Sequence, residues 1–250
     1  MVALCLLPGA AQAADVDLLL PALRKAATTT VRGETSVTVA FPPRDPPVRT
    51  ARSLPPVTFL PALIRQNFDV RLSGQELVAS RPTQVFTLTP KVGKAASWRL
   101  WIDARWNVPL AYEERSADGS LARRAELLHA EKLQKRASPL ALKPLPGLNK
   151  AALRALPGLQ LPAGFQAFRV GQRKAGPEII LSDGVNVLVL VLAQRGVRAA
   201  AGVASRKLDD GYLWLVGNLD AGRLAAMLAG VQRRDLSGPG NFLSGAASDQ

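Results

Sequence analysis

Three short runs near the middle of the chain alternate apolar and polar residues, and they constrain the fold more than any other feature. In residues 83–89, Phe86 and Leu88 lie on one side of an extended chain, because successive side chains of a strand point to opposite faces. Residues 98–103 and 110–115 follow similar patterns, and prolines and an Asp-Gly pair separate the runs. We therefore predict an antiparallel meander with one buried face.

Two of the four tryptophans, Trp98 and Trp101, lie in the middle run and point to opposite faces. One is expected in the core and the other exposed or lining a concavity, whereas cross-strand packing of both is the more ordinary interpretation. The apolar side of the meander could hold an acyl chain or an apolar segment of a partner, unless a helix covers it. This candidate face comprises Phe86, Leu88, Trp98, Leu100, Ile102 and Tyr112.

The segments before the meander predict a helix followed by the start of a sheet. Residues 15–27 carry apolar side chains at helical spacing, with Asp15 as the N-cap. Residues 28–41 are rich in threonine and valine and are expected to form a strand. Residues 42–61 are dense in proline and cannot contribute a central strand.

A short helical turn and a hairpin are expected between the Pro-rich stretch and the meander. The helical turn falls at residues 60–67. Residues 68–72 place Phe68, Val70 and Leu72 on one face, and residues 75–79 follow after Ser73-Gly74, a pair typical of turns. This pattern predicts two short strands joined at that pair.

A stretch rich in proline and leucine, residues 137–162, separates the first half from a second α+β region. Within it, Asn149 is expected to cap a short helix at residues 150–156. Residues 195–206 are expected to be a mobile crossing, and residues 236–250 a disordered tail. Four strands and a helix are predicted at residues 165–174, 178–183, 186–193, 212–217 and 221–232. The third strand is apolar on both faces, so it should be central.

The sequence offers few groups suited to catalysis or metal binding. His129 is the single histidine and Cys5 the single cysteine, and no Gly-x-Ser-x-Gly elbow is present. Glu113-Glu114 and Asp209-Asp210 are adjacent pairs whose side chains diverge in a strand, so we expect them to be solvated charges. We predict no catalytic residue, no metal site and no cofactor.

The chain is strongly basic. It has 32 Lys and Arg against 19 Asp and Glu, a formal net charge of +13 and a pI near 10.8. Such a charge favours polyanionic partners, although a solvated basic surface is an equally ordinary interpretation. The basic residues are scattered and no nucleic-acid-binding motif is visible, so nucleic acid is not expected as a partner.

The first residues resemble a secretory signal peptide. Residues 2–8 are an apolar run, and Ala11-Gln12-Ala13 is a small-x-small site that predicts cleavage after Ala13 and export. A basic n-region is missing, so a longer signal and an ordinary apolar N-terminus remain alternatives. A lipid anchor on Cys5 is the minor alternative, because Leu4 stands where a lipobox has a small residue.

Several motifs in the meander occur together in one known family. They are Arg81-Pro82, Leu88-Thr89-Pro90, Arg99-Leu100-Trp101-Ile102-Asp103, Val108-Pro109-Leu110 and Asp118-Gly119. This set resembles the end of the lipoprotein-carrier-like domain in the MucB/RseB family. The motif residues expected to be structural are Arg81, Pro82, Arg99, Trp101, Asp103, Pro109 and Gly119. Leu161-Pro162-Ala163-Gly164-Phe165 and Ser182-Asp183-Gly184 fall where the family's smaller C-terminal domain would begin.

The resemblance implies an α+β fold: an open antiparallel half-barrel with a covering helix, then a smaller antiparallel sheet domain with a C-terminal helix. It places a final strand at residues 120–133, where composition alone would favour helix. The Pro-rich stretch replaces strands that relatives have, so the half-barrel should be narrower. The expected divisions are a signal peptide (1–13), the sheet domain (14–136), a linker (137–160), the C-terminal domain (161–234) and a tail (235–250).

The resemblance also implies a function. Members of the family are periplasmic, non-enzymatic regulators that bind the extracytoplasmic tail of a membrane-bound anti-sigma factor, and lipid signals release that contact. The expected partners are therefore such an anti-sigma factor and, in addition, an acyl lipid or an anionic lipid head group. A periplasmic carrier of lipid or lipoprotein is the alternative, and a basic domain that contacts anionic membrane is a third.

Overall fold

The computed structural model describes residues 8–198 and 200–235, with side chains from Asp15 onward. The chain divides into two units, each with its own sheet. The first unit comprises Met1–Lys91 and Ala96–Leu142, and the second comprises Val92–Ala95 and Lys143–Gln250. Cys5, the alternative site for a lipid anchor, and the predicted tail at residues 236–250 lie outside the described residues.

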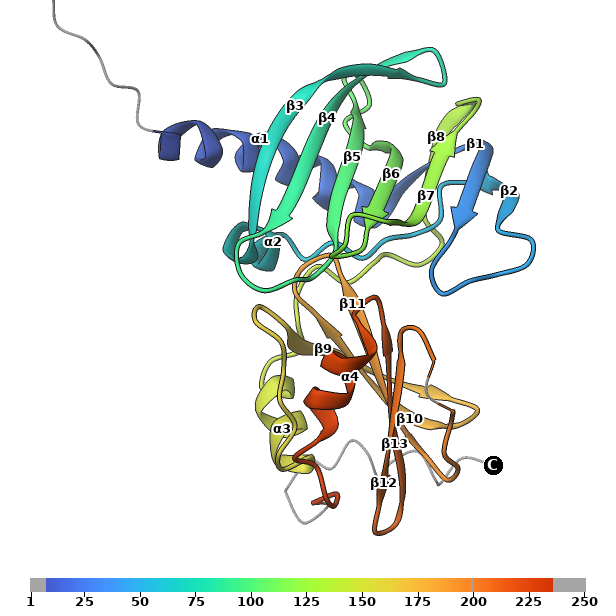
Figure 1. Ribbon diagram of the computed structural model, residues 1–250. Helices are drawn as coiled ribbons and strands as arrows, with labels where there is room; N and C mark the ends of the chain where they lie inside the picture. The colour runs from blue at the N-terminus through green and yellow to red at the C-terminus, as the bar shows by residue number, and fades with distance from the viewer. Residues whose placement is uncertain (1–7, 199, 236–250) are drawn as a thin grey trace, which may run out of the picture. The chain divides into compact units, whose positions relative to one another are not determined.

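The first unit is built on an open sheet of eight antiparallel strands (Figure 1). Their order is β2-β1-β7-β6-β5-β4-β3, and β8 also pairs with β1. The strands are β1 (Thr29–Val39), β2 (Val48–Ser53), β3 (Phe68–Val78), β4 (Arg81–Pro90), β5 (Ser97–Asp103), β6 (Pro109–Arg115), β7 (Leu121–Leu127) and β8 (Lys132–Lys135). The α+β class and the open antiparallel sheet are confirmed, and the meander β4-β5-β6 follows the alternating runs of the sequence.

Two helices belong to this unit, α1 (Pro8–Thr28) and α2 (Pro61–Asn67). α1 crosses one side of the sheet and contacts β1, β3 and β6 (Figure 1). Its apolar stripe is buried, with Leu19 and Leu23 fully inaccessible. The expected cap is wrong, because Asp15 lies inside the helix. Its carboxylate instead accepts a hydrogen bond from the backbone amide of Leu72 on the edge strand β3, at 3.0 Å.

The hairpin expected around Ser73-Gly74 is also wrong. β3 is one continuous strand, and its register with β4 shifts between Leu72 and Gly74 as a bulge. A glycine relieves the strain of such a bulge, and Gly74 has φ +150°. The chain turns instead at Ala79 and Ser80, which both adopt positive φ. The Ser-Gly pair therefore bends a strand and does not end it.

Three further predictions concern strands. β7 and β8 confirm the choice of strand over helix at residues 121–136. β2 was missed within the Pro-rich stretch, where a short proline-free run is accommodated at the edge of the sheet. β12 (Val203–Leu208) was missed within the expected mobile crossing. Neither strand has a strict apolar alternation, so its pairing depends on a neighbour that the sequence pattern does not reveal.

The second unit has a five-stranded antiparallel sheet in the order β12-β13-β11-β10-β9. The remaining strands are β9 (Gln166–Arg173), β10 (Gly176–Ser182), β11 (Val187–Ala193) and β13 (Gly211–Gly217). The central place of β11 is confirmed. The helices α3 (Leu148–Ala155) and α4 (Ala221–Leu228) share one core with Leu188, Leu190 and Leu215 of the sheet.

The ends of these two helices differ. Asp220 caps α4, since its carboxylate accepts a hydrogen bond from the Arg223 amide at 2.9 Å. The cap expected for α3 is wrong. Gly147 occupies the N-cap with φ +74°, and the Asn149 amide oxygen accepts a hydrogen bond from the Ala167 amide of β9 at 2.9 Å. Asn149 thus ties α3 to the sheet.

Candidate functional site

The six residues of the predicted apolar face lie together on one side of the first sheet. The register pairs Leu88 with Trp98 and Phe86 with Leu100, and Leu100 with Tyr112 on the next strand. All six are at most 3% exposed. The rings of Trp98 and Tyr112 lie 5.8 Å apart at a tilted angle. The face is closed in this conformation, because the buried stripe of α1 lies on this side of the sheet.

One small cavity reaches this face beside Tyr112. It has a volume of about 20 Å³, and its lining includes Ala26, Leu54, Phe59 and Arg136. That space suits one water molecule rather than an acyl chain. Burial raises the pKa of Tyr112 and lowers the pKa of Arg136, whose Nε donates to the Ala26 carbonyl at 2.8 Å. Arg136 therefore holds the end of α1 against the end of the sheet.

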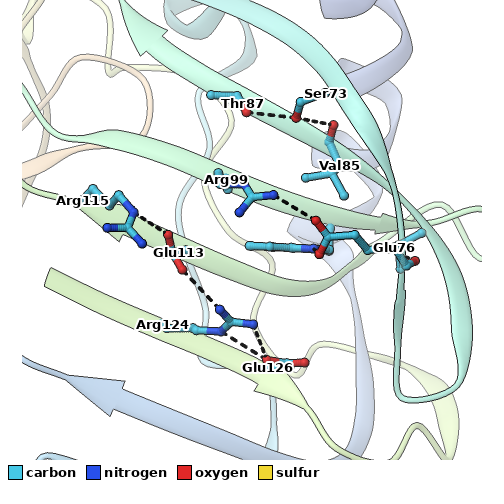
Figure 2. Close-up of polar contacts among 11 residues, drawn as sticks. Ser73, Glu76, Val85, Thr87, Arg99, Glu113, Arg115, Arg124 and Glu126 are labelled. Atoms are coloured by element: carbon cyan, nitrogen blue, oxygen red, sulfur yellow. Dashed lines mark hydrogen bonds and ion pairs between the residues drawn. The ribbon is translucent and has the colours of Figure 1, made fainter. Parts of the chain in front are cut away.

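The opposite side of the sheet carries Trp101, which contacts three charged side chains. Figure 2 labels these three residues, Glu76, Arg99 and Arg124. Trp101 is 1% exposed, and its indole N–H donates to Glu76 at 2.7 Å. The guanidinium groups of Arg99 and Arg124 lie 4.8 and 5.3 Å from its ring centre. Both tryptophans of β5 are thus buried, as the packing interpretation held. Trp101 belongs to an apolar cluster that includes Val85 and Leu110, and arginines also lie over its ring.

Ion pairs connect the strands around Trp101. Glu113 accepts from Arg115 at 2.7 Å and lies 3.3 Å from Arg124, which also pairs with Glu126 at 2.7 Å (Figure 2). The expectation that Glu113-Glu114 is solvated is wrong, since these residues are 3% and 5% exposed. Their partners come from β7, where Arg124 and Arg123 stand directly opposite them.

The same side of β3 carries a polar contact at the bulge. The Ser73 hydroxyl lies 3.1 Å from the Val85 carbonyl and 3.0 Å from the Thr87 hydroxyl (Figure 2). Arg99 pairs with Glu76 of β3 at 3.0 Å. Polar groups on this side of the sheet therefore bind one another across β3, β4 and β5, and the ion pairs of Glu113 and Arg124 do so across β6 and β7.

Arg81 and Asp103, two of the family-motif residues, build the corner between β5 and β6. Arg81 donates to both carboxylate oxygens of Asp103, at 2.5 and 3.1 Å. Asp103 also accepts from the amides of Arg105 and Trp106, and the Arg81 guanidinium lies 3.5 Å from the Trp106 ring centre. Burial raises the pKa of Asp103, but these hydrogen bonds outweigh burial and leave the pKa below its ordinary value. The carboxylate is a structural anion.

The other motif residues also lie at turns and strand ends. The Pro82 carbonyl accepts from the Ala104 amide at 3.0 Å, and Pro109 is buried opposite Ile102. Gly119 adopts φ +83° in the β6–β7 turn, where its carbonyl accepts from Arg115 at 2.9 Å. The sequence alone could not show Glu76 as the partner of Arg99 and Trp101, or Arg124 beside Trp101, because it does not reveal the strand register.

A second buried aspartate lies in the turn between β10 and β11. Asp183 is 2% exposed and accepts from the Asn186 amide and side chain at 2.9 and 2.8 Å. Burial raises its pKa to about 6, although hydrogen bonds from Asn186 and from backbone amides act in the opposite direction. This carboxyl group titrates in a range where Asp103 stays ionised.

A metal site would need a cluster of ligands, and a membrane anchor would need a long apolar helix. Within residues 8–198 and 200–235, no three His, Cys, Asp or Glu residues gather in a way that could hold a metal ion. In the same part of the chain, no helix combines the length and the apolar character needed to cross a membrane. His129 is exposed in the turn between β7 and β8.

Known proteins match this chain in structure, although none of those compared matches it by sequence. No protein-family model matches the sequence, and no curated protein matches it by sequence. A crystal structure of MucB superposes with a TM-score of 0.60 at 18% identity, covering 89% of this chain and 98% of MucB. The complex of MucA and MucB from Pseudomonas aeruginosa gives 0.58 at 18% identity, covering 89% and 99%.

A second complex, of MucB with MucA(peri), gives a TM-score of 0.55 at 17% identity and covers 90% of this chain and 99% of the other. Identities this low establish the fold and leave function to separate argument. The likeness extends over both units and agrees with the motifs found around Arg81, Trp101 and Asp103. The chain has the fold of MucB, and its sequence carries motifs that resemble those of the MucB/RseB family.

Proposed function

We propose that this chain is an exported, non-enzymatic regulator that binds the extracytoplasmic part of a membrane-bound anti-sigma factor and so modulates envelope-stress sigma-factor signalling. The observation that carries the proposal is the likeness to MucB over about nine-tenths of the chain, including two structures in which MucB is bound to MucA. The motif resemblance in the first sheet is independent support, because it depends on the amino-acid sequence alone.

The chemistry of the described residues suits a binding protein. The buried polar groups, such as Asp103 and Glu113, are paired within the fold and hold turns and strands in place. The net charge of +13 favours a partner with acidic segments and accelerates its encounter at low ionic strength. The contacts of this protein would thus be selected by surface charge and shape.

Export by the Sec route is part of the proposal, with cleavage after Ala13. That position falls inside α1, so processing would shorten the helix at its N-terminal end. The contacts that fix the helix begin after it: Asp15 binds the Leu72 amide, and Asp17 pairs with Arg65 of α2. The processed chain would keep these contacts.

Regulation by lipid is a further part of the proposal. The closed apolar face and the 20 Å³ cavity leave too little space for an acyl chain, so lipid would bind only if α1 moved. A ligand that binds the open state more tightly weakens the binding of a partner that prefers the closed state. The size of this effect is limited by the ligand's difference in affinity for the two states. The closed face weighs against the alternative of a lipid carrier, which would keep an open pocket.

A membrane pull-down tests the partner. Tagged protein, purified from the periplasm, is incubated with detergent-solubilised membranes of its source, and the retained proteins are identified by mass spectrometry. We expect a single-span membrane protein with a cytoplasmic sigma-binding domain. Retention of an acyl lipid without such a protein would contradict the proposal and favour carriage. Repeating the capture after adding lipid separates regulation from simple binding.

A further inference from the structure

The strand β2 forms one edge of the first sheet and pairs with β1 alone among the described strands. It spans six residues without proline, and most of its side chains are exposed, including Val48 at 52%. An edge strand of this kind presents a row of backbone groups to which another extended chain can bind. The opposite edge, β3, differs, because Asp15 of α1 occupies the Leu72 amide there.

The register shows which backbone groups of β2 point outward. The Val39 amide donates to the Pro47 carbonyl, so odd-numbered residues of β1 direct their backbone groups toward β2. Val37 and Thr35 are opposite Arg49 and Ala51, which therefore bond to β1. Backbone groups of successive strand residues point to opposite sides of the strand. Those of Val48, Thr50 and Arg52 therefore point away from β1.

The side chains of β2 add charge to both faces of this edge. Arg49 stands opposite Val37, and the register continues through Ala125 to Tyr112, so Arg49 lies on the face that α1 covers. Arg52 alternates to the other face, where it borders an open groove of about 420 Å³ along with Thr50, Glu34 and Glu131. Glu131 in that groove pairs with Arg32 at 3.2 Å. β2 itself carries two arginines and no acidic residue.

These charges select among possible occupants. Two copies of β2 placed edge to edge would gather four arginines and no acidic side chain along one seam, and like charges close together destabilise a strand pair. An extended segment with acidic side chains on both faces would instead meet Arg49 and Arg52 while its backbone bonds to Val48, Thr50 and Arg52. We infer that β2 is a docking edge for an extended acidic segment of another protein, bound as an added strand.

This inference does not depend on the anti-sigma partner proposed above. The full chain is titrated with an eight-residue peptide in which pairs of glutamates alternate with pairs of valines, so that both faces of the extended peptide carry acidic side chains. A matched peptide has lysine in place of every glutamate. We expect binding of the acidic peptide alone, with an affinity that falls as salt increases. The same acidic peptide with N-methyl groups on alternate amides should bind about tenfold more weakly, because its backbone cannot complete the ladder.

Three protein variants sharpen the test. Thr50→Pro removes an outward backbone donor and should weaken acidic-peptide binding about tenfold. Arg49→Glu combined with Arg52→Glu should reverse the preference and bind the lysine peptide, a gain that misfolding cannot produce. Arg24→Glu combined with Arg105→Glu changes two exposed arginines outside β2; it is the charge-matched control for the double variant and should leave binding unchanged. Equal binding of the N-methylated peptide, or an equal loss in the control, would overturn the inference.

Discussion

Asp103 of the first sheet and Asp183 of the second sheet are buried to almost the same extent, yet their pKa values move in opposite directions. Asp103 is 1% exposed and Asp183 is 2% exposed, and each accepts backbone amides of the turn that follows its strand. Two things differ: Asp183 lies deeper in its unit, which raises the cost of its charge, and Asp103 has an added partner. Asp103 receives a guanidinium from Arg81, whereas the bonds that lower the pKa of Asp183 come from neutral groups.

The comparison shows that burial alone does not set the charge of a carboxyl group. A two-bond guanidinium contact offsets the cost of removing the charge from water, and neutral donors offset only part of it. The first turn is therefore expected to be insensitive to pH near neutrality, while the second changes its protonation near pH 6. The two units should respond differently to acid.

The largest effect is expected when the charged member of the first pair is removed. Asp103→Asn leaves Arg81 without its carboxylate and weakens the bonds to the turn amides, so the free energy of unfolding should fall by about 3 kcal/mol. Urea unfolding at pH 7 measures this, with hydrogen exchange of β5 and β6 locating it. A loss below about 1 kcal/mol would show that the pair contributes little.

A somewhat smaller effect, about 2 kcal/mol, is expected when the cation is removed instead. Arg81→Met keeps part of the packing on Trp106 but leaves the Asp103 carboxylate buried without its counter-ion. The pKa of Asp103 should then rise, which would make it resemble Asp183. In the native protein, the stability from Asp103 is present above about pH 4 and is lost as the pH falls through its lowered pKa. In the variant, stability should instead increase on acidification, and a native-like pH profile would contradict the comparison.

The second unit provides a pH test of intermediate size. The pKa of Asp183, about 6 when folded, lies above its unfolded value near 4, so the folded state binds more protons between these values. Stability should therefore be greatest below about pH 4, fall as the pH rises to about 6, and stay lower above it. Asp183→Asn should remove this trend, which is of the order of 2 kcal/mol. Hydrogen exchange of β10 and β11 at several pH values checks it; an unchanged trend in the variant would assign it to another group.

The smallest effect is expected for an exposed pair of similar composition. Arg99→Met breaks the ion pair with Glu76 and the contact with the Trp101 ring, but both charged side chains are substantially exposed. The loss should be below about 1 kcal/mol. This variant is the matched control for Arg81→Met, since each arginine pairs with a carboxylate and lies over a tryptophan. Equal losses in both would remove burial as the explanation.

Much of the fold follows from local pattern. The alternation of Trp98, Leu100 and Ile102 predicts β5 and its buried face, and the apolar run of residues 187–193 predicts a central strand. These predictions succeed because the spacing of apolar residues along a strand shows whether one face or both faces are buried. β2 and β12 lack this signature, and their formation depends on neighbouring strands.

The ion pairs on the polar side of the first sheet could not be predicted from the sequence, because they too depend on neighbouring strands. Glu113-Glu114 reads as an exposed pair until Arg124 and Arg123 are known to stand opposite on β7. The register of two strands is a property of the assembled sheet, and the position of the Asp15 carboxylate beside Leu72 is another such property. The motif residues were found, but their partners were not.

The strand β1 has a consequence for how the chain folds as it is synthesised. It pairs with β2 soon after it in sequence, but Thr35 also stands opposite Leu127, and Thr30 opposite Gln134. Its partners on that side leave the ribosome much later than β1 itself, so the first sheet cannot be completed until β8 has emerged. Such long-range pairing slows folding. A nascent chain paused before β7 would present β1 as an unprotected edge to chaperones and proteases.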